Sequence, residues 1–291
     1  MVSPKHINAL ISLLDDPDAE VYGAVSEALI QNGVGILPEL ETAWETSALE
    51  LVQNRLENII FTIQFNDSAR MLQTWLDDGA RSLLYGVFIV AKSYFPELDF
   101  DTIENKVKIM CHRIWLELND GRSALETVQT INRFIYGEYG YRIPQQLSPD
   151  SHFINCALQS KKVSPPMLSL LYAIVAQTLN LPIYPVKLPK HIILAYMNKQ
   201  ADAQAPNAIY FYINPAHRGM AFSRLEVENA LRHEGSNERC SLQPCSNAES
   251  VRMLLRSLVF NFERTNHPQH ASRYKQLMAQ IDQHLANKER E

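Results

Sequence analysis

Residues 163–198, "VSPPMLSLLYAIVAQTLNLPIYPVKLPKHIILAYMN", combine an apolar helix pattern with two strand patterns. Ser164 before Pro165 is typical of a helix start, because a serine hydroxyl caps free N–H groups and proline has no N–H to leave unpaired. Short β-branched and aromatic runs then predict strands at 181–188 and 191–197, with a third at 207–214. The stretch therefore predicts a buried helix beside a small antiparallel sheet.

The rest of the chain has mostly helical patterns. Apolar residues recur at helical spacing in the first 65 residues and continue from residue 66 to the start of the sheet, and three further helices are expected after Phe222. The predicted fold class is α+β and mostly helical. We expect two domains, an N-terminal helical segment at 1–65 and a main domain at 66–291.

Large side chains at helical spacing in the main domain are predicted to be core residues. Such rows of apolar side chains belong to a hydrophobic core far more often than to a cofactor-binding site. They are Trp75, Phe88, Tyr94, Met110, Trp115, Ile131 and Phe134.

Composition argues against several classes of function. The net charge of −5 and the scattered basic residues do not favour binding to nucleic acid. The sequence contains neither GxGxxG nor GxxxxGK[ST], so we expect no nucleotide cofactor. The apolar run at 83–91 is too short to span a bilayer, and the N-terminus lacks the pattern of a signal peptide, so we expect no membrane partner and a cytoplasmic location.

Four cysteines in 291 residues do not indicate a disulfide framework. Cys240 and Cys245, with His233 upstream, raise the possibility of a zinc site. The C-x4-C spacing is loose and a second pair of ligands is not evident, so we favour free thiols and expect no metal.

The motif order resembles the transglutaminase core and, more closely, the transglutaminase-like family named for the bacterial regulator SirB. The matching segments are "SHFIN" at 151–155, "VSPPMLSLLYAIVAQTLNLP" at 163–182, "LPKH" at 188–191, "INPAHRG" at 213–219 and "SVRMLLRSLVFNF" at 250–262. The resemblance covers about residues 70–290 in order. The segment "LISLLDDPDAEVYGAVSEALIQNG" at 10–33 resembles one HEAT-type helical repeat. Because a single repeat cannot cover its own apolar face, we expect it to need a cover from the main domain.

The resemblance assigns roles to particular residues. It implies a nucleophilic cysteine at the helix start, a histidine base at the head of a strand and an aspartate that orients the histidine. These positions hold Pro165, His191 and Asn214. Pro165 offers no nucleophile, whereas Asn214 is a milder change and is expected to hydrogen-bond to His191.

Two other residues are candidate nucleophiles. Ser164 lies at the mouth of the helix, where its alternative role is the N-cap, which we favour. Cys156 lies nine residues before the helix start and is otherwise an inert packed thiol.

Two functional hypotheses follow. The first is a non-catalytic transglutaminase-like protein that acts in protein interaction or regulation, with another protein as its partner. The second is a hydrolase or acyl transferase of the cysteine-protease type that uses His191 and Asn214 with Ser164 or Cys156. The second requires a hydroxyl or thiol within hydrogen-bond reach of His191.

Overall fold

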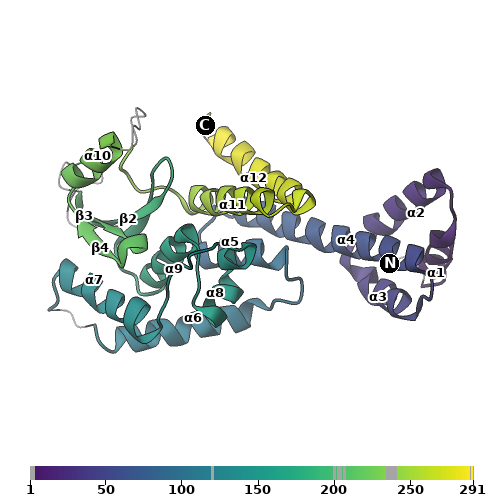
Figure 1. The fold of residues 1–291 in the computed structure, drawn as a ribbon, viewed down its shortest axis with the longest axis horizontal. Helices are drawn as coiled ribbons and strands as arrows, with labels where there is room; N and C mark the ends of the chain where they lie inside the picture. The colour runs from purple at the N-terminus through teal and green to yellow at the C-terminus, as the bar shows by residue number, and fades with distance from the viewer. Residues whose placement is uncertain are drawn as a thin grey trace. The chain divides into compact units, whose positions relative to one another are not determined.

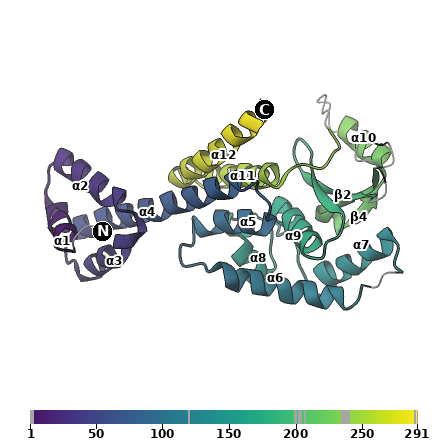
Figure 2. The same ribbon diagram turned by 180° about the vertical axis from the view of Figure 1, so that it is seen from behind.

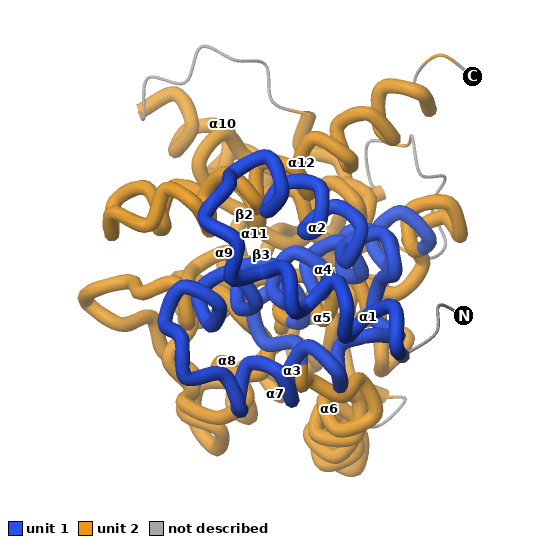
Figure 3. The backbone as a smooth tube through the Cα atoms, turned by 90° about the vertical axis from the view of Figure 1, so that its right-hand side faces the viewer, with its two compact units in different colours: residues 1–74, 92–96 blue, residues 75–91, 97–291 orange. Residues whose placement is uncertain are grey.

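The computed structural model describes residues 4–118, 121–198, 201, 205, 208–233, 241–288 and 290. The chain divides into two compact units (Figure 3). Unit 1 holds residues 1–74 and 92–96, and unit 2 holds residues 75–91 and 97–291. The domain boundary expected between residues 65 and 66 lies within a single helix, Glu50–Asp77.

Unit 1 is built from helices around its own core. Its helices are α1 (Pro4–Ser12), α2 (Ala19–Gln31), α3 (Leu37–Thr46) and the part of α4 (Glu50–Asp77) that precedes residue 75. Helix α2 begins where the Asp18 carboxylate accepts a hydrogen bond from the Glu20 N–H at 2.8 Å, which caps a free backbone donor. Short 3-10 turns, η1 (Leu13–Asp15) and η2 (Gly33–Ile36), connect the helices.

The apolar faces of α1, α2 and α3 are covered from within unit 1. The core combines residues of those helices with Val52, Leu56, Ile59 and Ile63 of α4. The first half of α4 therefore covers the apolar faces of the repeat-like pair, and the expected further cover from the main domain stays a prediction. Helix α4 continues without a break past residue 66. The two helical patterns expected before and after that residue therefore form one helix.

Helix α9 (Pro165–Thr178) forms the centre of unit 2. Every residue from Met167 to Ala176 is buried, so this helix has no solvent-facing side over that range. Around it lie α5 (Leu83–Lys92), α6 (Phe100–Trp115), α7 (Ala124–Asn132) and α8 (Ile154–Ser160) (Figure 1). A π-helix, η3 (Arg133–Glu138), continues α7, and a 3-10 turn, η4 (Pro149–His152), precedes α8.

The sheet has four antiparallel strands in the order β1-β2-β3-β4. They are β1 (Ile183–Lys187), β2 (Ile192–Met197), β3 (Ile209–Asn214) and β4 (Met220–Phe222). The three predicted strands are confirmed; β4 was not expected, since three residues carry too little pattern. Helix α9 packs against β1 and β2, while the other face of the sheet packs on Val227 of α10 (Arg224–His233) (Figures 1 and 2).

Two long helices end the chain. Helix α11 (Asn247–Arg264) starts in a capping box, in which Ser246 and Glu249 each satisfy the other's backbone N–H. Helix α12 (Pro268–Lys288) packs along α11, and the two are joined by the Arg252–Asp282 ion pair. Within the described residues, no helix has the length and apolar character needed to cross a membrane. The predicted α+β, mostly helical class is confirmed.

Five of the large side chains predicted as core are buried, namely Trp75, Phe88, Met110, Ile131 and Phe134. Tyr94 is half-buried. The prediction for Trp115 is wrong, because its side chain at the end of α6 is 60% exposed. Helical spacing alone did not separate this residue from the buried positions of α6, because Trp115 follows the buried Cys111 by four residues, close to one helical turn.

Candidate functional site

The start of α9 is closed by its own cap. The Ser164 hydroxyl is fully buried and accepts a hydrogen bond from the Met167 N–H at 3.3 Å, and Pro165 occupies the first helical position. The Ser164 N–H donates to the Ser151 carbonyl at 2.8 Å, which fixes the entry of the chain into the helix. A hydroxyl that is buried and engaged in this way supports the interpretation of Ser164 as an N-cap.

The first half of α9 lies against the beginning of β2. The Ser169 hydroxyl, one turn into the helix, donates to the Ile192 carbonyl at 2.8 Å in a buried position. His191 immediately precedes Ile192, so the fold brings the helix start and this histidine to the same region. This hydrogen bond ties the first half of α9 to the strand that follows His191.

His191 lies in a tight turn. The Leu188 N–H donates to the His191 carbonyl at 2.9 Å, and the Arg256 guanidinium of α11 donates to the Pro189 carbonyl at 2.6 Å, which anchors the turn to that helix. The His191 side chain is exposed. Within the described parts of the chain, its ring makes no hydrogen bond with a hydroxyl or a thiol, the contact that the enzyme hypothesis requires.

Asn214 ends β3 and caps the turn that follows. Its side-chain oxygen accepts a hydrogen bond from the Ala216 N–H at 3.0 Å and so starts the 3-10 turn η5 (Pro215–His217). The expected hydrogen bond between Asn214 and His191 is not formed in the described structure. The Asn214 side chain is instead held in its own turn by the hydrogen bond from the Ala216 N–H, two residues along the chain.

Cys156 lies in the first turn of α8 and is half-buried. Burial, followed by the nearby Asp150 carboxylate, raises the pKa of its thiol to about 11. The thiol is therefore protonated at neutral pH, and the thiolate is the nucleophilic form. Burial likewise raises the pKa of the Cys111 and Cys245 thiols to about 11. Cys240, part of the zinc hypothesis, lies outside the described residues.

A histidine–serine pair that sequence reasoning missed lies beside the start of α9. The His152 ring is fully buried in η4, and its Nε2 lies 3.0 Å from the hydroxyl of Ser257 on α11. Its Nδ1 lies 3.3 Å from the Ser148 carbonyl. A carbonyl only accepts, so Nδ1 carries the proton and Nε2 accepts from Ser257. The two residues are 105 positions apart, and no local pattern links them.

The comparison with protein families decides the membership of the chain. A family model described as the transglutaminase-like superfamily matches residues 101–256, which is 156 of the 291 residues. The chain belongs to the transglutaminase-like superfamily. No curated protein and no solved structure shows a significant match.

The transglutaminase-like region runs from α6 to Arg256 of α11 and includes α9, the sheet and all four candidate residues. Cys156, Ser164, His191 and Asn214 all lie within it. The start of α9 is joined to η4 by the Ser164–Ser151 hydrogen bond, and Arg256 of α11 holds the turn at 188–191. The turn η5, which Asn214 caps, also packs on α9. The superfamily match thus agrees with the fold that the motif order predicted.

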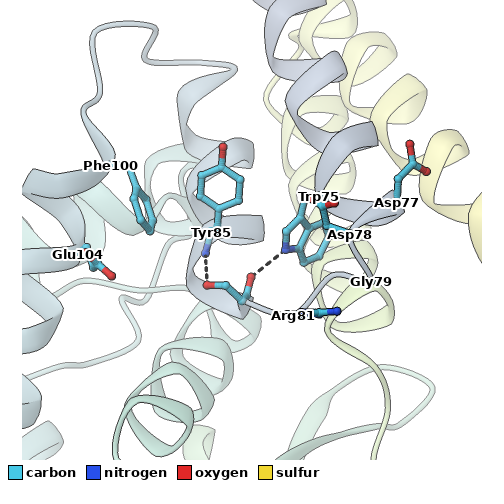
Figure 4. A pocket seen from close by; sticks show the side chains of 9 residues that line it. Trp75, Asp77, Asp78, Gly79, Arg81, Tyr85, Phe100 and Glu104 are labelled. Atoms are coloured by element: carbon cyan, nitrogen blue, oxygen red, sulfur yellow. Dashed lines mark hydrogen bonds between the residues drawn. The ribbon is translucent and has the colours of Figure 1, made fainter.

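Two hollows in unit 2 lie away from these residues. A cavity of about 790 Å³ is lined by Trp75, Tyr85, Phe100 and Glu104, with Trp75 Nε1 donating to the Ser82 carbonyl at 3.0 Å (Figure 4). A neighbouring cavity of about 770 Å³ includes Gln177 and Thr178, at the end of α9 opposite Pro165. Neither hollow is lined by any of the four candidate residues.

Proposed function

We propose that this protein is a non-catalytic member of the transglutaminase-like superfamily, of the SirB type, that acts through binding another protein. The observation that carries this proposal is the start of α9. The family resemblance puts the nucleophile position at Pro165, and the adjacent Ser164 hydroxyl is buried and hydrogen-bonded as a helix cap. The exposed His191 ring, which has no hydroxyl or thiol partner among the described residues, and the raised pKa of the Cys156 thiol support it further.

Finer features belong to the same proposal. The motif segments at 151–155, 188–191 and 213–219 support the SirB type, and the helix–turn–helix of α1 and α2 supports a HEAT-like N-terminal segment. A cytoplasmic location belongs to the same proposal and is supported by the free thiols of Cys111, Cys156 and Cys245.

A second candidate function rests on the pair formed by Ser257 and His152. A hydroxyl that donates to a histidine whose other nitrogen is held by an acceptor has the arrangement of a nucleophile and its base. Burial, however, lowers the pKa of His152 to about 4, and a base is most effective when its pKa lies near the working pH. A serine hydrolase activity is therefore the less favoured function.

Activity-based labelling separates these proposals. We expect neither a thiol-directed nor a serine-directed probe to label the purified protein in a way that depends on His191 or His152. The measurement is intact-protein mass spectrometry of the wild type, His191→Ala and His152→Gln. Labelling of Cys156 or Ser164 that is lost in His191→Ala would establish the cysteine-protease type of function.

Labelling of Ser257 that is lost in His152→Gln would establish the serine hydrolase function instead. Labelling that persists in both variants would identify an ordinary accessible thiol or hydroxyl, and it would leave the non-catalytic proposal standing.

A further inference from the structure

Helix α6 presents large apolar side chains to solvent on its outward side. Ile109, Trp115 and Leu116 are 64%, 60% and 65% exposed, and the His112 ring stacks on Trp115 with ring centres 5.9 Å apart. Ile109, His112 and Leu116 follow the three- and four-residue spacing of one helix face. We call these four residues the α6 face. Exposed apolar side chains that are close to one another and rimmed by polar residues mark interaction sites more often than scattered single side chains do.

Cations border the α6 face on one side. The Arg113 guanidinium lies 5.5 Å from the centre of the Tyr139 ring, and the Lys161 ammonium lies 5.8 Å from the same ring. Two cations thus meet at a single tyrosine. Burial and, second, the ammonium of Lys106 lower the pKa of Lys161, which places Lys106 on the same border.

Two further basic residues are backbone neighbours of Lys161. The Arg142 N–H donates to the Lys161 carbonyl at 2.9 Å, and Arg142 pairs with Lys162 in an isolated bridge. We call Lys106, Arg113, Arg142, Lys161 and Lys162 the cationic border.

The positive charge of the border is only partly neutralised. Arg113 is paired with Glu138 at 3.0 Å. In the described part of the chain, no ion pair involves Lys106, Arg142, Lys161 or Lys162. Because the whole chain has a net charge of −5, this excess of positive charge is a local feature. A local excess of one sign favours a partner of the opposite sign.

We propose that the α6 face and its cationic border bind an acidic amphipathic helix of a partner protein. Apolar side chains of such a helix cover Ile109, Trp115 and Leu116, while its carboxylates meet the border, as in other complexes where a helix occupies an apolar groove. Carboxylates of Glu117 and Glu138 lie beside the same region and are paired with Arg133 and Arg113. These carboxylates disfavour binding to an anionic bilayer, because a bilayer would cover the whole surface and meet them. A single helix can bind without contacting them.

This inference rests on the proposed role in protein binding and names the chemistry of the partner. The probe is a fluorescein-labelled peptide of about 18 residues, with leucine on one helix face and glutamate elsewhere. A second peptide carries lysine in place of glutamate. Fluorescence anisotropy with the full chain measures both affinities. We expect the glutamate peptide to bind saturably, to weaken as salt rises from about 0.05 M to about 0.5 M, and to bind more tightly than the lysine peptide.

Two double variants test the two parts of the surface. Ile109→Ser with Leu116→Ser removes apolar area, and Lys106→Glu with Lys162→Glu reverses charge at exposed positions. Each is expected to weaken binding at least about tenfold, a change of about 1.4 kcal/mol. The matched controls are Leu225→Ser, at a leucine that is 62% exposed on α10, and Lys187→Glu on β1, and neither should change the affinity.

Several outcomes would overturn the inference. They are absence of binding to the glutamate peptide, equal affinity for both peptides, or unchanged affinity in both double variants. Binding to vesicles of phosphatidylcholine with phosphatidylglycerol, without peptide binding, would identify a membrane surface. Self-association that both variants abolish, again without peptide binding, would identify a second copy. Labelling by the activity probes is measured in a separate experiment. A failure of the non-catalytic proposal can therefore be told apart from a failure of the α6 face to bind the peptide.

Discussion

At the scale of single residues, the polar groups near the start of α9 are buried and hydrogen-bonded within the fold. Ser164 is a cap, and the His152 ring is held on both nitrogens by Ser148 and Ser257. Removing water from an imidazole disfavours its charged form, which is the reason its pKa falls. We therefore expect substitutions of these residues to change the free energy of unfolding.

His152 should make the stability of the protein depend on pH. Its pKa falls from the usual 6.5 to about 4 in the folded protein, so the unfolded chain binds a proton more readily. The stabilisation is fully present above about pH 6.5 and is lost as the pH falls from there to about 4, by about 3 kcal/mol in all. Urea unfolding at several pH values measures this loss.

The control for this measurement is the exposed His217. His152→Gln should flatten the dependence between about pH 6.5 and 4, whereas His217→Gln should leave it unchanged. An identical slope in the wild type and His152→Gln would show that other groups cause the acid sensitivity.

At the scale of elements, the turn after β3 is fixed by the helices that pack on it. Asn132, at the end of α7, donates through Nδ2 to the Gly219 carbonyl at 2.9 Å. Tyr136 of the π-helix η3 donates to the Pro215 carbonyl at 2.9 Å. A π-helical turn changes the direction of the side chains that follow it, and such turns are frequent at functional sites. Here η3 aims Tyr136 at the turn that Asn214 begins.

Gly219→Ala should destabilise this turn. Gly219 has a φ of +71°, and an added Cβ would lie 1.9 Å from the side-chain oxygen of Asn132, which also accepts from Tyr172. The backbone strain and the collision together should cost about 2 to 4 kcal/mol of the free energy of unfolding. Chemical denaturation with circular dichroism gives this value directly.

Gly137, inside η3, is the matched position, because an added Cβ there meets nothing within 4 Å. Gly137→Ala should be neutral or stabilising by up to about 1 kcal/mol. Equal stability of the two glycine variants would contradict the close approach of the Asn132 side chain to Gly219.

At the scale of the whole molecule, the two units differ in charge and have separate cores. Residues 1–74 carry eleven acidic and three basic side chains, although the cationic border lies in unit 2. The core of unit 1 consists of residues between Ile7 and Ile63 and so lies entirely within that unit. A core that is complete within one unit favours independent unfolding of that unit.

Calorimetry should show this independence. Leu56→Ala removes a fully buried side chain from the unit 1 core and should cost about 2 to 5 kcal/mol, which lowers one thermal transition and leaves the other in place. Leu171→Ala, in the buried helix α9 of unit 2, should lower the other thermal transition and leave that of unit 1 in place. A single transition that both variants lower equally would mean that the continuous helix α4 couples the units into one cooperative fold.

The sequence by itself determined the class of fold, the helix start at Ser164 and Pro165, the three main strands and the likeness to the transglutaminase core. Each of these depends on side chains that are close along the chain, such as a cap and its helix or an alternating strand. Membership of the superfamily over residues 101–256 agrees with these local patterns.

Tertiary structure alone decided which groups meet. The pair formed by His152 and Ser257 joins segments 105 positions apart, and the cationic border draws on α6, α8 and the segment around Arg142. The exposure of Trp115 depends on which side of α6 the rest of the fold covers, and the side-chain oxygen of Asn214 satisfies its own turn instead of reaching His191. Contacts between distant segments leave no periodic signal along the chain, because they depend on how elements pack and not on the order of neighbouring residues.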